Sequence, residues 1–553
     1  MLVRSRVAAL LPLLVAAGVA VGFNAAFLGP MARDPAHRLL SGAFHGGHLW
    51  CFDLAWGLLS GLDPWSLETQ RLGFPSGASA RCLALAPAFA TAPARLLVDG
   101  LTAYNLCILL TPAVTVLFTM LLMRRVTELD RWSAAAVGGL YAVCPYVFGC
   151  FAGGQTCKAQ VWVVPMTLWT LAGAVDGPRR PLWVLGAGLG GTILAFTEPT
   201  YATIVPLVAV PWVGILIGRP RWASLVGGGL GLAACAMGIW SASLYYLHPV
   251  PPGFEAVFEP AGPLTSAGIP LPSPMAQPGP TLIGPPDLQL EPGAPNHVTY
   301  LGLPLLVAML LGSLPAWARG RRAQLLAWSA LVVGLLVAMG ERLVVDNQFV
   351  QVEGRPLVLP AWYLAKADYP LARSMMYYRG VVVAALGLAI GAVGLMSRWR
   401  WGALGAWLLV ALSLADTYRV LKPIWPLRSR VLDTEFFETL AADPVPGAVI
   451  GLPLAGTTRS GGLTVLDAAF HRRPTNGLVR FTDRRMTHVA SLQGWVQSAL
   501  RLPAAEGSAL LFSKGIRYVV AGEDMTEGEK MSLTLSLGRP EMLSGRVVWR
   551  VGP

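Results

Sequence analysis

The sequence predicts an α-helical polytopic membrane protein with about 11 transmembrane helices, followed by a small C-terminal α/β soluble domain. Three observations predict this class. Of 553 residues, 54% are apolar and 13% are charged, with a mean hydropathy of +0.56, whereas a soluble domain has about a quarter of charged residues. Apolar runs of about 20 residues, the length that crosses a bilayer, recur along residues 1–420. After residue 420 the composition changes.

Eleven segments have the length and apolarity of a transmembrane helix. The first follows two arginines, as in a secretory signal, but its apolar run is too long and no clear cleavage site closes it, so we expect a retained anchor. The segments lie at 7–29, 101–123, 132–150, 159–175, 181–197, 201–218, 222–246, 300–318, 323–340, 378–397 and 401–418.

The distribution of basic residues predicts the orientation of these segments across the membrane. Cytoplasmic loops are enriched in Lys and Arg, and the connection 248–296 contains neither. An N-terminus in the cytoplasm therefore predicts that the segment 421–553 is extracytoplasmic, in a periplasm or its equivalent. The net charge of +12 is then explained by the basic residues of the cytoplasmic connections. We therefore expect no nucleic-acid partner. The five predicted cytoplasmic connections carry Arg124–Arg125, Arg179–Arg180, Arg219 with Arg221, Arg319 with Arg321–Arg322, and Arg398 with Arg400.

Three extracytoplasmic loops are predicted within 1–420, at 30–100, 248–296 and 341–377. The first contains amphipathic stretches at 48–60 and 81–98, typical of helices that lie along a membrane surface. The second has 14 prolines, so it is expected to be extended, as a lid or a spacer.

The tail 421–553 is predicted to be a separate extracytoplasmic domain. About 21% of its residues are charged, against about 10% in the remainder. Runs typical of strands alternate in it with runs typical of helices, which indicates a small α/β unit. The expected strands are 448–453, 516–521 and 546–551, and the expected helices are 434–442, 486–501 and 505–513.

Cysteines and glycines indicate packing, not a cofactor. The seven cysteines form no CxxC pair and no Cys/His cluster, so we expect no structural metal. Cys51 with Cys82, or Cys150 with Cys157, are candidate disulfides on an oxidising face; otherwise these residues act as small hydrophobes. The glycine runs 186–191 and 227–231 fall inside predicted spans, where small residues let helices pack closely.

Candidate functional residues are the ionisable groups at the predicted outer ends of the spans, because such groups are costly at membrane depth. Asp53 lies in an apolar, aromatic stretch, where burial would raise its pKa and suit it as a general base; the alternatives are a helix cap or a partner of an arginine. His48 is a second candidate base. Glu198 either lines a polar cavity or caps a helix before a proline. Asp63, before a proline, is interpreted as a turn residue.

Two cations on the same predicted side are candidate ligands for a phosphate. Arg379 offers a bidentate fork and Lys158 offers a point charge. The alternative for each is that the side chain extends to the membrane interface.

Several short motifs follow one another along nearly the whole chain: Trp56 with 73–77, then 103–105, 141–146, 300–302, 360–379, 451–453, 471–477 and 514–520. Their order resembles the GT-C superfamily of polytopic glycosyltransferases, in particular a bacterial branch with a C-terminal extracytoplasmic domain. Relatives usually show a Gly-Asp pair before the tryptophan, where this chain has Gly47-His48.

The resemblance implies transfer of a sugar from a polyprenyl-phosphate carrier to the hydroxyl of a glycan or protein acceptor. The carrier tail would remain in the lipid bilayer, its phosphate would meet Arg379 or Lys158, and Asp53 would accept the proton of the hydroxyl, with inversion at the anomeric carbon. No cofactor is expected. A divalent metal is left open but is not indicated, because no second carboxylate is expected beside Asp53.

Two other classes remain open. A non-catalytic membrane component of cell-surface polysaccharide assembly would keep this scaffold, and the departure at His48 favours it. A secondary transporter would have two related halves, which the sequence does not show.

Overall fold

The computed structural model describes residues 2–41, 45–66, 68–69, 71–72, 74, 78–79, 82, 84–218, 221–247, 300–313, 321–340, 344–345, 348–360, 362–363, 377–396, 401–432, 434–452, 454, 468–476, 486–522, 525–543 and 545–553. The predicted loop 248–296 lies outside these ranges, as does 364–376 of the predicted loop 341–377. The chain divides into two compact units. Unit 1 is Met1–Arg33, Leu106–His248 and Phe258–Arg428, and unit 2 is Asp34–Asn105, Pro249–Val257 and Ser429–Pro553.

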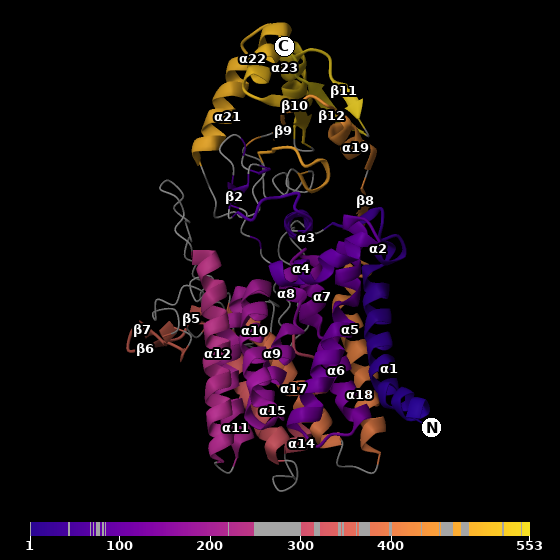
Figure 1. Ribbon diagram of the computed structural model, residues 1–553, viewed down its shortest axis with the longest axis vertical. Coiled ribbons are helices and arrows are strands. Elements are labelled where there is room, and N and C mark those ends of the chain that lie inside the picture. Colours follow the sequence, from indigo (N-terminus) through magenta and orange to yellow (C-terminus); the bar gives the residue numbers. More distant parts are fainter. Residues whose placement is uncertain are drawn as a thin grey trace. The chain divides into compact units, whose positions relative to one another are not determined.

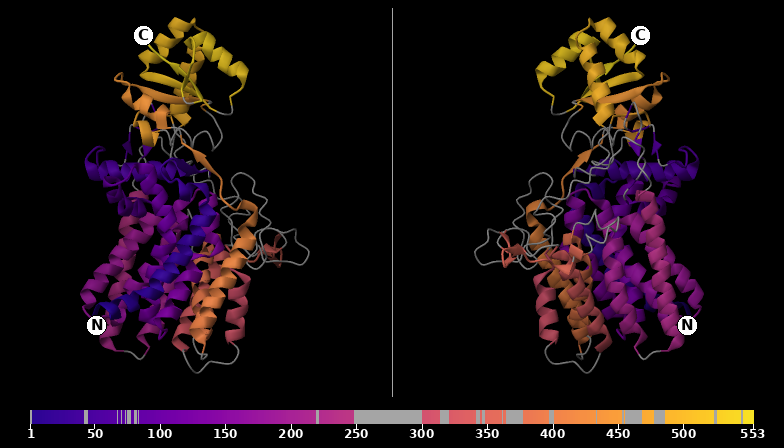
Figure 2. Two further views of the ribbon diagram at one scale, coloured as in Figure 1. Left: turned by 90° about the vertical axis from the view of Figure 1, so that its right-hand side faces the viewer. Right: turned by 90° about the vertical axis from the view of Figure 1, so that its left-hand side faces the viewer.

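Unit 1 is a bundle of helices that run side by side, as the views in Figure 1 and Figure 2 agree. Two short β-ladders, β4 with β5 and β6 with β7, accompany the helices. The elements are α1 (Leu2–Leu28), α2 (Pro30–Arg33), α5 (Gly100–Val126, which begins in unit 2), α6 (Arg131–Ala142), α7 (Pro145–Ala152), α8 (Thr156–Ala159), α9 (Val163–Asp176), α10 (Arg180–Thr197), α11 (Pro199–Ile217), α12 (Trp222–Leu247), α14 (Leu303–Ser313), α15 (Arg321–Ala338), β4 (Val344–Val345), β5 (Gln348–Phe349), β6 (Gln351–Val352), β7 (Arg355–Pro356), η4 (Tyr377–Gly380), α17 (Val381–Met396), α18 (Gly402–Leu421) and η5 (Lys422–Ile424).

Each of the eleven predicted membrane segments overlaps at least one of these helices, and the segment 132–150 is divided between α6 and α7. Six described stretches are long and apolar enough to cross a membrane by length and composition, and three shorter apolar helices accompany them. The protein is therefore a multi-helix membrane protein, and eleven crossings stay a prediction. The six stretches are Leu10–Leu28, Gly100–Val126, Arg131–Ala152, Pro199–Ile217, Trp222–Leu244 and Gly402–Ile424; the shorter helices are Val163–Asp176, Arg322–Ala338 and Val381–Gly394.

Close backbone approach explains the glycine runs of the spans. A Cβ at Gly191 of α10 would lie 2.3 Å from the carbonyl oxygen of Cys235 in α12, and a Cβ at Gly227 of α12 would lie 2.2 Å from the carbonyl oxygen of Ala174 in α9. Real Cβ atoms do not approach backbone oxygens so closely, so glycine is required at both positions. The predicted role of these runs in helix packing is confirmed.

Unit 2 contains a four-stranded mixed sheet in the order β11-β12-β10-β9. The pair β9–β10 is parallel, and β10–β12 and β11–β12 are antiparallel. Two smaller ladders pair β1 with β8 and β2 with β3, both antiparallel. The elements are β1 (Arg38–Leu40), α3 (His45–Ser60), β2 (Glu68–Thr69), β3 (Ala78–Ser79), α4 (Leu85–Thr91), η1 (Ala92–Leu96), β8 (Ser429–Val431), α19 (Thr434–Ala442), β9 (Ala448–Leu452), α21 (Met486–Ala499), α22 (Ala504–Ser513), β10 (Ile516–Ala521), α23 (Glu527–Leu537), β11 (Glu541–Leu543) and β12 (Arg546–Arg550).

Alternation along the strands of the four-stranded sheet builds a core on each face. Ala448 and Ile450 of β9 point with Trp549 of β12 into a core that α21, α22 and α23 cover. Val449 and Val548, the intervening residues, point into a second core that α19 covers with Phe436, Phe437 and Leu440. A period of two in a strand covered on both faces produces two such cores.

The predicted elements of the tail are confirmed, and its extent as an independent unit is larger than predicted. Strands β9, β10 and β12 and helices α19, α21 and α22 coincide with the six predicted runs, while α23 and β11 were not predicted. Unit 2 also includes Asp34–Asn105, most of the segment that the sequence assigned to a loop of the membrane part. The two predicted amphipathic stretches of that segment contain α3, α4 and η1.

We expect Gly227→Ala to destabilise the protein by about 1–3 kcal/mol, the usual effect of overpacking, because its methyl group would meet a backbone oxygen of α9. Gly229→Ala is the matched control, since a Cβ there meets nothing within 4 Å. Thermal unfolding in detergent measures both. Equal midpoints for the two variants would contradict the close packing of α9 and α12.

Candidate functional site

Asp53 lies on α3 of unit 2, and the local sequence explains its surroundings. Gly57 lies one helical turn after Asp53 on the same face. A Cβ at Gly57 would lie 1.8 Å from Oδ2 of Asp63, and the amides of Leu62 and Asp63 both donate to the carbonyl oxygen of Gly57. The missing side chain at Gly57 therefore lets the chain turn back after α3 and places Asp63 on the face that carries Asp53.

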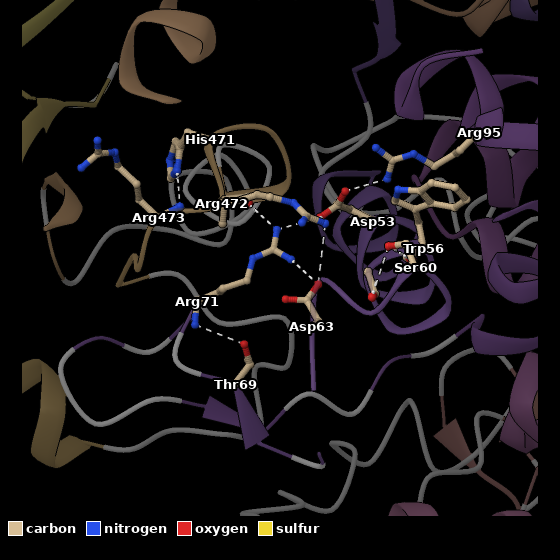
Figure 3. A network of polar contacts seen from close by, with 12 residues as sticks. Asp53, Trp56, Ser60, Asp63, Thr69, Arg71, Arg95, His471, Arg472 and Arg473 are labelled. Carbon is tan, nitrogen blue, oxygen red and sulfur yellow. Dashed lines mark hydrogen bonds and ion pairs between the residues drawn. The ribbon is translucent and has the colours of Figure 1, made fainter. Parts of the chain in front are cut away.

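Three arginines hold Asp53 (Figure 3). Oδ2 accepts a hydrogen bond from Arg71 Nη2 at 2.7 Å and lies 3.4 Å from Arg472 Nη2, and Oδ1 accepts from Arg95 Nη1 at 2.6 Å. Arg71 also donates from Nη1 to Asp63 at 3.1 Å, so a single guanidinium bridges both carboxylates. Short, charge-assisted bonds of this kind are the strong ones, and we call Asp53, Asp63 and the three arginines the arginine clamp.

The arginine clamp corrects two predictions. Burial would raise the pKa of Asp53, but the nearby charges of Arg71 and Arg472 and the hydrogen bonds of Arg95 and Arg71 outweigh burial and hold that pKa below its ordinary value. The predicted raised pKa is therefore wrong, whereas the alternative of an arginine partner is confirmed. The prediction of no second carboxylate beside Asp53 is also wrong, because Asp63 shares Arg71 and Arg472 with it.

Backbone contacts bind Arg71 to the 468–476 segment of the tail. Arg71 Nη2 donates to the carbonyl oxygen of Ala468 at 2.8 Å, and the amide of Thr475 donates to the carbonyl oxygen of Arg71 at 3.0 Å. Arg472, in the same segment, has a φ of 57°, a left-handed conformation that costs a non-glycine residue about 1–2 kcal/mol. The fold therefore maintains Arg472 in a strained conformation beside Asp53, as residues at functional sites often are.

A cavity of about 510 Å³ opens beside the arginine clamp, entirely within unit 2. This volume is in the range of small-molecule sites. Asp53, Arg95 and Arg472 line it together with Asp99, His37 and Glu438 and with the apolar side chains of Leu49, Phe437 and Phe470. Phe437 and Phe470 are stacked with ring centroids 4.5 Å apart. A polyhydroxylated ligand fits these linings, since they combine hydrogen-bonding groups with aromatic rings.

His48 is buried on α3 at 7% exposure. Five residues separate it from Asp53, which at 100° a residue places the two side chains about 140° apart around the helix. The helix therefore directs His48 away from the arginine clamp, and a role as base stays a prediction. Another histidine of α3, His45, has Nδ1 2.7 Å from the hydroxyl of Tyr104.

Glu198, Arg379 and Lys158, which the sequence proposed separately, form one buried cluster in unit 1. Glu198 precedes α11 and accepts from Arg379 Nη1 at 2.5 Å and from the amide of Thr200 at 3.3 Å. Arg379 Nη1 also bonds the hydroxyl of Thr200. The predicted cap is therefore present, whereas the alternative that Glu198 lines a polar cavity stays a prediction. Arg379, at 5% exposure, is buried beside Glu198.

Lys158 completes the cluster. Its side chain is 5% exposed, its ammonium interacts electrostatically with Arg379 and Glu198, and in the described part of the chain it forms no ion pair. Its backbone oxygen accepts from the hydroxyl of Tyr201, which lies 3.2 Å from that of Tyr146. Two cations and one carboxylate are thus buried among helices whose other buried side chains, in the described ranges of unit 1, are uncharged.

Of the two candidate disulfides, one forms. Cys51 of α3 is bonded to Cys82, and Cys150 and Cys157 are free. The sequence analysis did not identify Arg71, Arg95 or Arg472. No three His, Cys, Asp or Glu side chains gather as metal ligands within the described ranges.

The comparison with solved structures confirms the predicted resemblance at the level of the fold. Two solved structures are similar to the chain. The arabinofuranosyltransferase AftD from Mycobacteria is 14% identical, with a TM-score of 0.57 over 98% of this chain and 40% of AftD. The oligosaccharyltransferase of Archaeoglobus fulgidus is 11% identical, with a TM-score of 0.53 over 95% of this chain and 71% of that chain.

The chain thus spans about 40% of the length of AftD. No protein-family model and no curated protein matches the sequence. At these identities the similarity concerns the fold, and the activity is a separate question.

The disulfide predicts how many cysteines a maleimide labels with and without reduction. Denatured protein treated with a maleimide should take up five labels without reductant and seven after reduction, because five of the seven cysteines are not in a disulfide. These are Cys107, Cys144, Cys150, Cys157 and Cys235. Intact-mass spectrometry counts the labels. Seven labels without reductant would contradict the bond between Cys51 and Cys82.

The lowered pKa of Asp53 predicts a pH-dependent contribution to stability. Because the folded pKa is below that of the unfolded chain, about 3.9, the contribution is complete above about pH 4 and is lost as the pH falls through the folded value. Asp53→Asn should cost about 3–5 kcal/mol at pH 7, as for a broken buried ion pair, and less at pH 3. Thermal unfolding at both pH values measures the difference.

The control is Asp176→Asn, which removes a more exposed ion pair with Arg125 and should cost about 0–1 kcal/mol at pH 7. A cost of Asp53→Asn that is the same at pH 7 and pH 3 would mean that the ionised carboxylate does not stabilise unit 2.

Proposed function

We propose that the protein is a membrane glycosyltransferase that moves a sugar from a polyprenyl-phosphate carrier to an acceptor hydroxyl on the outer side of a bacterial inner membrane, with inversion. The observation that carries this proposal is the cluster of Glu198, Arg379 and Lys158, three charged groups that are buried within the helices of unit 1. Charged groups are rare at such positions and mark binding sites. The fold shared with two transferases supports the proposal.

The donor site is assigned to unit 1. The carrier tail remains in the bilayer, and its phosphate pairs with Lys158 as a point charge and with Arg379 as a planar fork. As the sugar leaves, negative charge develops on the bridging phosphate oxygen, and these cations stabilise that charge.

The acceptor site is assigned to the cavity of unit 2. The acceptor oxygen forms a bond to the anomeric carbon while the bond from that carbon to the phosphate oxygen breaks, so a single displacement inverts the configuration. Asp53 orients the acceptor hydroxyl, and the proton passes to the carboxylate or to solvent. The arginine clamp favours the ionised form of Asp53, in which both oxygens act only as hydrogen-bond acceptors.

The distribution of cysteines supports an extracytoplasmic unit 2. Both cysteines of the disulfide, Cys51 and Cys82, belong to unit 2, and the five free cysteines belong to unit 1. Structural disulfides persist in oxidising compartments such as a periplasm.

A second candidate function is a non-catalytic component of cell-surface polysaccharide assembly that binds the lipid carrier. The observation that favours it is the arginine clamp itself, because both oxygens of Asp53 already accept hydrogen bonds from arginines. A carboxylate in that state is a weak base.

Transfer from radiolabelled polyprenyl-phosphate sugars into membrane extract separates the two candidates. The purified parent should transfer at least one sugar, and Asp53→Asn should lower the rate about 10²–10⁴-fold. Asp443→Asn is the matched control: it breaks an ion pair with Arg517 in the same unit but does not line the cavity. A parent that binds carriers and transfers no sugar would support the assembly component.

A further inference from the structure

Among the described residues, the charges of the cluster in unit 1 do not balance. Glu198, Arg379 and Lys158 are exposed by only 2%, 5% and 5%, so water screens them weakly. Their other polar neighbours, Cys150, Cys157, Tyr146 and Tyr201, are ordinarily neutral at pH 7. One carboxylate therefore stands against two cations among the described residues, which leaves one positive charge.

The geometry assigns that charge to Lys158. Glu198 bonds Arg379 at 2.5 Å, while Lys158 forms no ion pair in the described ranges. A buried unpaired charge is costly, so the cluster has room electrostatically for one further negative charge. An anion with two negative charges would instead leave an excess charge in the same buried site.

Phosphodiesters and phosphomonoesters differ in this respect, because a diester has one negative charge and a monoester has nearly two. A phosphodiester has one negative charge at neutral pH, whereas a phosphomonoester has about 1.5–2, because its second pKa is about 6. A carrier joined to its sugar through one phosphate is a diester. The same carrier after transfer ends in a monoester and has gained negative charge.

We propose that Glu198 determines the specificity of the lipid-phosphate site. Its carboxylate sets the net charge of the cluster to one positive unit, so the site prefers a carrier that ends in a phosphodiester to one that ends in a phosphomonoester. This inference rests on the assignment of the donor site to unit 1. It also supplies a reason for product release, because loss of the sugar changes the phosphate from the favoured to the disfavoured charge state.

A purely structural role for Glu198 makes a different prediction. As the residue before α11, it accepts only one long backbone bond, from Thr200, and an uncharged side chain can supply such a bond. If capping were its only role, an uncharged replacement would alter the affinities for the two phosphates equally.

The test uses two probes with the same lipid tail, undecaprenyl phosphate and its methyl ester, which differ in charge at the phosphate. Their dissociation constants are measured with the full chain in nanodiscs at pH 7.5. The parent should bind the methyl ester about tenfold more tightly, the effect of about 1.4 kcal/mol. In Glu198→Gln the cluster has two positive charges, and the preference should disappear or reverse.

Two controls separate charge from shape. Glu198→Asp retains the charge and should retain the preference of the parent. Asp416→Asn removes a carboxylate of unit 1 that pairs with Arg419 and should leave the ratio of the two dissociation constants unchanged. A second measurement needs no variant: the parent should bind undecaprenyl phosphate more like the methyl ester at pH 5.5, where the monoester has mainly one charge.

The outcomes distinguish this inference from the proposed function. An unchanged preference in Glu198→Gln, or a parent that prefers the monoester at pH 7.5, overturns the role of Glu198 and leaves the donor site intact. Binding of neither probe by the parent overturns the donor site, and the inference with it. A monoester affinity that does not rise at pH 5.5 overturns the argument from charge even if Glu198→Gln fails to fold.

Discussion

The two-sided contact of Arg71 with Asp53 and Asp63 is the interaction on which unit 2 depends. Its guanidinium satisfies one carboxylate from α3 and one from the turn after α3, and it also donates to the carbonyl oxygen of Ala468 in the tail. One planar group thereby connects two segments that are 397 residues apart in the sequence. Arginine suits this position because its five donors have a fixed geometry, which a lysine lacks.

Patterns of neighbouring residues predicted most of the helices and strands, because both kinds of element depend on residues that are close together in the sequence. Apolar runs placed a helix at each of the eleven expected segments, and the alternation of residues such as Val449 and Ile450 placed the strands of the tail. The arginine clamp is not local: its partners lie 18, 42 and 419 residues from Asp53. The one available signal was that Arg71 and Arg95 interrupt an outer segment rich in apolar residues, where a nearby carboxylate is their natural partner.

The two buried clusters differ in their balance of cations and carboxylates. Around Asp53, three arginines surround two carboxylates, and the cavity adds the carboxylates of Asp99 and Glu438, so a neutral, polyhydroxylated ligand fits that environment. Around Glu198, two cations share one carboxylate, so an anion fits. The sequence suggested Glu198, Arg379 and Lys158 as separate candidates but could not predict this balance, since they come from the residue before α11, from η4 and from α8.

The arginine clamp is compatible with transfer because of the chemistry of the leaving group. A phosphate leaves the anomeric carbon without help from a strong nucleophile when cations stabilise it, so the acceptor hydroxyl needs orientation more than deprotonation. A carboxylate whose pKa is lowered is a weak base but a reliable hydrogen-bond acceptor, since it stays ionised. Arg472 is the weakest member of the clamp, at 3.4 Å and with a strained backbone. It is therefore the group whose displacement by a ligand costs the least, and its displacement opens one acceptor position on Oδ2 of Asp53, which Arg71 still contacts.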